Sequence, residues 1–228
     1  MNHLPILPVL VPLATAIVLL LAERRGQAWQ RRLSGLGLLA LLASAFALVE
    51  ASEHRVLVYL VGDWPARLGI ALVADRLSAL LVMAGGLLAL PALLYASSGW
   101  DREAAHFHPL FHLQLMGING AFLTGDLFNL FVFFEVMLIA SYGLLLSGGR
   151  GARMRAGLHY VVFNITASSL FLLALGLLYG MLGSLNMAEM ARRIALAPAQ
   201  DLPLIRAGAG LLLVVFCAKA ALLPLHLW

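Results

Sequence analysis

The chain has 228 residues, of which 62% are hydrophobic and 11% charged, and its mean hydropathy is +0.95. Soluble domains are about 45–50% apolar and about 25% charged, so the composition indicates an integral membrane protein. The single cysteine excludes an internal disulfide framework and any multi-cysteine metal site. Although the net charge is +4, no nucleic-acid ligand is expected, because the arginines lie in short loops rather than in a basic stripe with interleaved aromatics.

Apolar segments recur along the whole chain. A helix needs about 20 mostly apolar residues to cross the hydrocarbon core. The sequence predicts an all-α integral membrane fold, a polytopic bundle of about seven transmembrane helices that forms a single transmembrane domain over residues 1–228. The expected spans are 4–22, 33–50, 77–96, 108–124, 127–147, 158–182 and 206–224.

Polar segments between the spans carry signals of local structure. Residues 56–78 are rich in β-branched residues around a Gly-Asp-Trp-Pro turn, which predicts a short hairpin. Asn186 precedes Glu189 by three residues, a spacing typical of a capped start to a short surface helix. Only Gly125 and Asp126 separate the fourth and fifth spans, which predicts a tight helical hairpin with Asp126 as the helix cap.

The arginines indicate how the chain crosses the membrane. Short loops dense in arginine face the cytoplasm, and the loops 23–32 and 148–157, which includes Arg150, are of this kind. Both lie on one side if seven helices alternate. We therefore expect a multi-pass protein of the cell (inner) membrane, with its N-terminus outside and its C-terminal end cytoplasmic.

The stretch FNLFVFFEVMLIASY, residues 128–142, is a mostly apolar run with one carboxylate in its middle. That carboxylate, Glu135, lies near the centre of the fifth span, where an ionisable residue costs about 2.5–3.5 kcal/mol on insertion scales. Intramembrane acids of this kind are functional by default. The alternative is a glutamate held in a fixed ion pair, or kept neutral by a hydrogen bond.

The chain has one lysine, Lys219, which also falls within a span. Unlike arginine, a desolvated lysine can lose its proton, so Glu135 and Lys219 resemble a titratable pair. The fifth and seventh helices run in the same direction in this topology. With a rise of about 1.5 Å per residue, the two side chains differ in depth by about 6 Å. The pair can therefore meet directly or through a water if the two helices are neighbours.

Pro224 predicts a break in the seventh helix, because it lacks the N–H that would bind the carbonyl of Ala220. Broken helices line ion sites in transporters. The alternative is an ordinary helix end at the cytoplasmic interface, with Trp228 as an aromatic anchor.

Other polar residues are weaker candidates. Tyr142, His159 and His226 are possible members of a proton path. His106, His108 and His112 are too near an interface, with too few partners, to indicate a metal, and no nucleotide, haem or iron–sulfur motif predicts a cofactor. Several polar residues in the spans fit hydrogen bonding between helices: Asn119, Asn164, Thr166, Ser168 and Ser169.

Three stretches identify a family resemblance: GDLFNLFVFFE, GLHYVVFNITASSLFLLALGLLYGMLGSLNMA and AKAALLPLHLW. They resemble the D subunit of the Mrp-type multisubunit monovalent cation/proton antiporters and, more distantly, the antiporter-like membrane subunits of respiratory complex I. The resemblance implies a proton-translocating fold with a broken seventh helix near Pro224. It also implies that Glu135 and Lys219 are the functional pair. Family members are about twice as long, so we expect this chain to match their N-terminal half.

The function expected from the sequence is that of a proton-translocating membrane subunit of a Na+ or K+/H+ antiporter, a transporter subunit rather than an enzyme. Its expected partners are the other subunits of a hetero-oligomeric membrane complex, protons, monovalent cations and the lipid bilayer. Two alternatives remain open, a membrane subunit of an NADH:quinone oxidoreductase or hydrogenase complex, and a non-transporting membrane scaffold.

Overall fold

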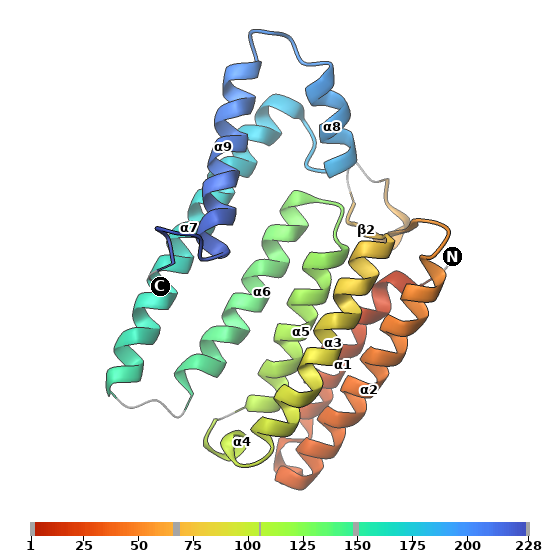
Figure 1. The fold of residues 1–228 in the computed structure, drawn as a ribbon, viewed down its shortest axis with the longest axis vertical. Coiled ribbons are helices and arrows are strands. Elements are labelled where there is room, and N and C mark those ends of the chain that lie inside the picture. The colour runs from red at the N-terminus through yellow and green to blue at the C-terminus, as the bar shows by residue number, and fades with distance from the viewer. Residues whose placement is uncertain (1–2, 66–68, 105, 148–150, 227–228) are drawn as a thin grey trace.

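The computed structural model describes residues 3–65, 69–104, 106–147 and 151–226 (Figure 1). The elements are almost all helical. The helices are α1 (Leu7–Leu21), α2 (Gln27–Ala51), α3 (Arg76–Ala96), α4 (Trp100–Glu103), α5 (Phe107–Leu123), α6 (Leu127–Leu146), α7 (Gly151–Leu182), α8 (Met187–Ala195) and α9 (Leu202–Lys219). Two strands, β1 (Leu57–Leu60) and β2 (Ala71–Ala74), and short 3-10 helices at Leu4–Ile6, Glu23–Arg25 and Val61–Asp63 complete the described chain.

Six helices in the described part of the chain are long and apolar enough to cross a membrane. They are α1 with its preceding 3-10 turn, α2, α3, α6, α7 and α9. The predicted span 108–124 corresponds to α5, which has 17 residues. The all-α membrane fold is thus confirmed, whereas the count of seven crossings stays a prediction.

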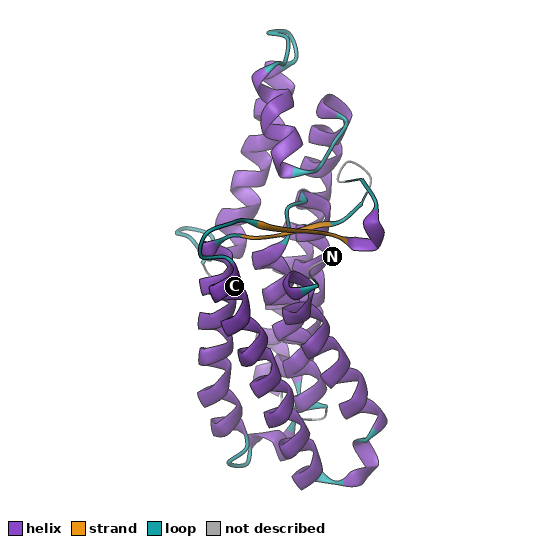
Figure 2. Ribbon diagram, turned by 90° about the vertical axis from the view of Figure 1, so that its right-hand side faces the viewer, coloured by secondary structure: helices purple, strands orange, loops and turns teal. Residues whose placement is uncertain are grey.

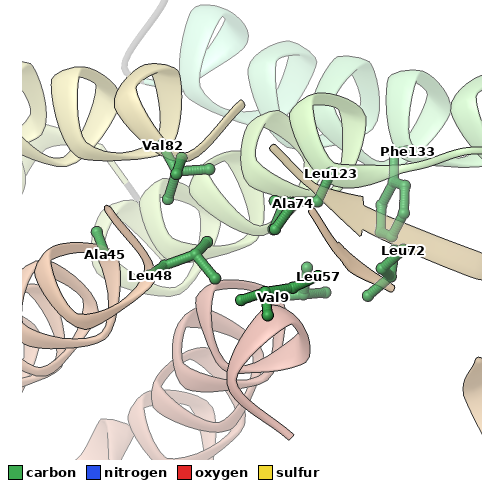
Figure 3. Close-up of a cluster of buried hydrophobic side chains, with 10 residues drawn as sticks. Val9, Ala45, Leu48, Leu57, Leu72, Ala74, Val82, Leu123 and Phe133 are labelled. Carbon is green, nitrogen blue, oxygen red and sulfur yellow. The ribbon is translucent and has the colours of Figure 1, made fainter. Parts of the chain in front are cut away.

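The helices are arranged around α5, which packs against α1, α3 and α6. α2 packs against α1 and α3, and α7 joins α6 to α9 (Figure 1). One apolar core fills the space where α1, α2, α3 and α5 meet the hairpin (Figure 3). Its members include Val9, Leu48, Leu72, Val82 and Leu123. A second core joins α6, α7, α8 and α9 around the fully buried Phe171.

The predicted hairpin is confirmed. β1 and β2 pair antiparallel, with Leu57 opposite Ala74, and the strands lie crosswise to the helices (Figure 2). Gly62 adopts φ 68 in the connection, a conformation that favours glycine. The Gly125 amide donates a 2.8 Å hydrogen bond to the carbonyl of Ala71, so the hairpin is tied to the α5–α6 turn.

The predicted helix caps are also present. The Asp126 side chain accepts a 2.9 Å hydrogen bond from the amide of Asn129, at the start of α6. The Asn186 side chain accepts one of 3.2 Å from the amide of Glu189, at the start of α8. Each cap satisfies an amide that has no partner within its own helix.

Three of the predicted spans were wrong at their boundaries. α2 and α7 begin before the predicted spans 33–50 and 158–182, because their arginine-containing first turns continue the helix beyond the apolar segment. The span predicted at 206–224 corresponds to α9, which begins at Leu202 and ends at Lys219.

The end of α9 corrects the predicted position of the helix break. The amide of Ala221 bonds the carbonyl of Ala218, and that of Leu222 bonds the carbonyl of Cys217, while Ala221 adopts φ 53. This is a Schellman ending, in which the residue in the left-handed conformation stops the helix. Pro224 therefore lies inside the irregular segment after α9 and does not start it. The predicted anchor Trp228 lies outside the described residues.

Candidate functional site

Glu135 lies near the middle of α6, one turn from the apolar Phe131, and its side chain is half-buried. Its carboxylate oxygen Oε1 accepts a short hydrogen bond from the hydroxyl of Ser168 on α7. Ser168 is 6% exposed, so this bond is made inside the α6–α7 interface. The glutamate thus has a hydrogen-bond donor that its own helix cannot supply.

Lys219 is the last residue of α9, and its ammonium nitrogen donates to the same Ser168 hydroxyl at 3.2 Å. The nitrogen also lies 5.5 Å from the centre of the Phe134 ring, within the range of a cation–π interaction. As the last residue of a helix, it faces carbonyls whose partial negative charge favours a cation. Glu135 and Lys219 therefore meet on opposite sides of one hydroxyl group.

Aromatic rings surround this hydroxyl-centred group. Phe171 lies one turn from Ser168 and makes edge-to-face contacts at 5.6 Å with Phe131 and with Phe216. Phe134 lies 6.2 Å from the same ring. An apolar surrounding strengthens electrostatic interactions relative to water. The electrostatic interaction between the two charged side chains is therefore stronger here than it would be in water.

A pocket of about 630 Å³ lies between the ends of α5, α6 and α7 and the segment that follows α9. Its polar lining includes Gln114, Ser141, Tyr160 and His226. The hydroxyl groups of Ser141 and Tyr160 lie 3.2 Å apart. Tyr142 contacts the Tyr160 ring edge-on at 5.6 Å. The structure thus brings two of the predicted path residues, Tyr142 and His226, to the neighbourhood of this pocket.

The other candidates do not join the group. His159 is exposed on α7, as is Thr166, whose hydroxyl bonds the carbonyl of Val162 in the same helix. Pro224 is exposed in the segment after α9. In the part of the chain that the structure describes, no group of three or more His, Cys, Asp or Glu residues could hold a metal.

From the sequence, Ser168 was predicted only as one of several residues that form hydrogen bonds between helices. A further signal was present in its spacing. Ser168 shares one buried face of α7 with Asn164, Phe171, Leu175 and Leu178, at the spacing expected of a packed helix face. A small hydroxyl on such a face indicates a polar contact with a neighbouring helix, but not which helix.

Six helices of membrane-spanning length in the described part of the chain define a polytopic membrane protein, in which Glu135 and Lys219 lie between helices. Residues 124–228 match the family model described as NADH:quinone oxidoreductase/Mrp antiporter, TM. The chain is 44% identical to the D subunit of a probable K(+)/H(+) antiporter of Rhizobium meliloti, over 100% of this chain and 43% of the relative. It is 39% identical to the D subunit of a Na(+)/H(+) antiporter of Alkalihalophilus pseudofirmus, over 100% of this chain and 46% of the relative.

A solved structure agrees with these sequence relatives. The Mrp complex from a Dietzia species contains a chain that superposes with a TM-score of 0.84 at 34% identity, covering 99% of this chain and 42% of that one. The predicted resemblance to the D subunit of Mrp-type antiporters is thus confirmed, and these relatives are antiporter subunits rather than enzymes. The chain spans about half the length of the curated relatives it matches.

Proposed function

We propose that this chain is the proton-translocating part of a monovalent cation/proton antiporter subunit, and that Glu135 and Lys219 carry the proton-coupled step. The observation that supports this proposal is the Ser168 hydroxyl, which donates to Glu135 and accepts from Lys219. The names of the similar proteins, D subunits of K(+)/H(+) and Na(+)/H(+) antiporters, support the same class of function.

The step follows from the charges around the hydroxyl. A carboxylate stabilises a nearby ammonium, and a protonated carboxyl no longer does. A proton that reaches Glu135 therefore weakens the electrostatic hold on Lys219, and the lysine then releases its own proton more readily. Ser168 accommodates both states, because a hydroxyl can donate one hydrogen bond and accept others at the same time.

Protons need a route to this group, and the pocket beside Tyr160 is the route we propose. His226 and Ser141 line it, and Tyr142 extends it along α6 toward Glu135. His159 is exposed on α7 and does not line this pocket. In this scheme Pro224 keeps the segment after α9 out of a helix, since it cannot donate a backbone hydrogen bond.

We also propose the orientation that the arginines predict and the partners that the family resemblance implies. The α1–α2 turn, α4 and the facing ends of α6 and α7 lie at one end of the molecule (Figure 1), and we assign this end to the cytoplasm; Arg150 lies outside the described residues. The chain would then be an inner-membrane subunit, with its N-terminus outside, that assembles with other membrane subunits.

A membrane subunit of an NADH:quinone oxidoreductase is the second candidate, because the matching family model covers both classes. Subunits that co-purify with this chain distinguish the two. Redox partners carry flavin or iron–sulfur centres, whereas antiporter partners do not.

The test of the proposed function is Glu135→Gln in the full-length subunit, assembled with its complex in vesicles. Glutamine keeps the size and the hydrogen bond but cannot carry the proton. We expect normal assembly and loss of cation-dependent proton flux, measured in the same vesicles. Glu50→Gln, an exposed change on α2, is the matched control. Normal flux in an assembled Glu135→Gln complex rejects the mechanism, and failed assembly favours a scaffold role.

A further inference from the structure

A second polar cluster lies in the α2–α4–α5 region, away from the hydroxyl-centred group. Asp101 of α4 has a side chain that is 0% exposed, and both its carboxylate oxygens accept hydrogen bonds of 2.7 Å from the guanidinium of Arg31 on α2. This guanidinium holds the pKa of the Asp101 carboxyl well below its usual range. Asp101 is therefore an ionised group that only accepts hydrogen bonds.

His108 of α5 is the third member of this cluster, and its tautomer follows from Asp101. Its Nε2 lies 3.2 Å from Asp101 Oδ2. Because an ionised carboxylate cannot donate, Nε2 of His108 carries the hydrogen, and Nδ1 of the neutral ring is then a bare acceptor. The ring is 3% exposed, and this Nδ1 is buried without a hydrogen-bond partner in the described part of the chain.

His112, one turn further along α5, repeats the arrangement. It is 0% exposed, and its Nε2 lies 3.0 Å from the hydroxyl and 3.2 Å from the carbonyl oxygen of Ser34. A carbonyl only accepts, so Nε2 carries the hydrogen here as well. Its Nδ1 is likewise buried without a partner within residues 3–65, 69–104, 106–147 and 151–226. An unprotonated imidazole nitrogen of this kind is able to accept a proton.

A pocket of about 270 Å³ connects this cluster to the surface. Asp101, His108 and Gln27 line its inner part. At its rim, Glu23 and His106 form a 3.2 Å pair whose side chains are about half exposed. The pocket thus places the His108 ring beside a polar cavity that reaches the solution.

We propose that His108 is a proton-binding site that exchanges protons with the solution through this pocket, independently of Glu135 and Lys219. A hydronium ion in the pocket transfers its proton to the Nδ1 lone pair of His108 and leaves as water. Asp101 stabilises the resulting imidazolium from α4, and Arg31 of α2 opposes it.

The other charged groups lie at the rim of the pocket. Glu23 favours a proton in the cavity, whereas Arg102 and a protonated His106 oppose it. All three lie nearer to water than His108 does, so they are screened more strongly. The carboxylate of Asp101, at hydrogen-bond distance in a buried position, dominates the field at His108.

The test is ¹⁵N-histidine NMR on the full-length subunit, assembled in lipid, across a pH series. We expect the His108 ring to change from the Nε2–H tautomer to the imidazolium as the pH falls through the series, and to exchange with deuterium from the solvent. His108→Gln assigns the signal, and His54→Gln, a change at an exposed hairpin-side residue, is the control. If the His108 variant does not assemble, His112→Gln removes the other buried signal and leaves that of His108 to be read.

Two outcomes overturn the proposal. One is a His108 ring that keeps one protonation state from about pH 4 to about pH 9, an interval that contains the ordinary range of imidazole titration. The other is a titration midpoint that moves in Glu135→Gln, because the two sites would then be coupled. An unchanged midpoint in that variant supports independence whether or not its proton flux is lost, so the failure of one proposal is distinguishable from the failure of the other.

Discussion

The cluster of Asp101 and Arg31 (the Asp101 cluster) and the group of Glu135, Ser168 and Lys219 (the Ser168 group) each bring a carboxylate and a cation together inside a helical bundle. Their geometry differs. Asp101 receives two parallel 2.7 Å bonds from Arg31. Glu135 and Lys219 instead contact opposite sides of one hydroxyl. A bidentate pair is strong and geometrically fixed, whereas a pair linked through a hydroxyl can change charge without losing every contact. The Asp101–Arg31 pair is therefore geometrically fixed, whereas the pair at Ser168 is the one that changes charge under the proposed function.

The residue types fit this division. Arginine stays protonated and presents a planar fork that matches a carboxylate. Lysine is a compact charge on a flexible chain and can lose its proton when desolvated. The Asp101–Arg31 pair uses arginine, and the Ser168 group uses lysine. The predictions below exchange or remove these features in turn.

Lys219→Arg should have the largest effect, because it gives the Ser168 group the chemistry of the fixed pair. Arginine keeps the charge but cannot release the proton, so we expect proton flux to fall about tenfold or more while the complex still assembles. Flux in vesicles is the measurement, and Arg206→Lys, an exposed exchange in the same helix, is the control. Full activity with arginine would leave Lys219 as a fixed charge only.

Asp101→Asn should break the fixed pair. The change removes the buried acceptor of both guanidinium hydrogen bonds and leaves the partly exposed Arg31 without its partner, so the protein should lose stability. We expect a lower unfolding temperature in detergent, with Asp63→Asn in the exposed hairpin turn as the control. Equal stability of the two variants would contradict the structural role. Replacing both Asp101 and Arg31 by apolar residues should restore much of the loss, since a buried pair can often be replaced without cost.

Ser168→Ala should sharpen the comparison by removing only the hydroxyl between the charges. The change removes one hydrogen-bond partner but leaves both charges in place, so we expect flux to fall several-fold and less than in Lys219→Arg. Ser168→Thr keeps the hydroxyl and should retain most activity. Native flux in the alanine variant would show that Ser168 serves packing alone.

Glu189 on α8 forms a partly exposed ion pair with Arg192 and Arg193, and this pair should have the smallest effect on stability. Arg192, and then Arg193, lower the pKa of its carboxyl from 4.5 to about 2. Because the folded pKa lies below the unfolded value, the stabilisation is present above about pH 4.5 and is lost as the pH falls toward 2. The effect is small, since exposed pairs are screened by solvent. The protection of the α8 amides from hydrogen exchange, measured relative to the intrinsic rate at each pH, should fall slightly with acid, and Glu189→Gln should remove this dependence.

Much of the fold could be predicted from the sequence. Apolar segments of membrane length, the β-branched residues around the hairpin turn and the cap at Asn186 are local signals, because each depends on residues close together in the chain. Glu135 and Lys219 were found in the same way, since a charge inside an apolar run is costly wherever the helix lies.

What the sequence determined by itself was therefore the membrane class, most helices and the two charged residues. Tertiary structure alone decided that Ser168 lies between them, that α9 ends at Lys219 with Ala221 rather than a glycine in the left-handed conformation, and that Asp101 meets Arg31. Ser168 is 33 residues from Glu135 and 51 from Lys219, and Asp101 is 70 from Arg31. Periodicity shows which face of a helix is packed, but the identity of the neighbour depends on how all the helices fill the bundle together.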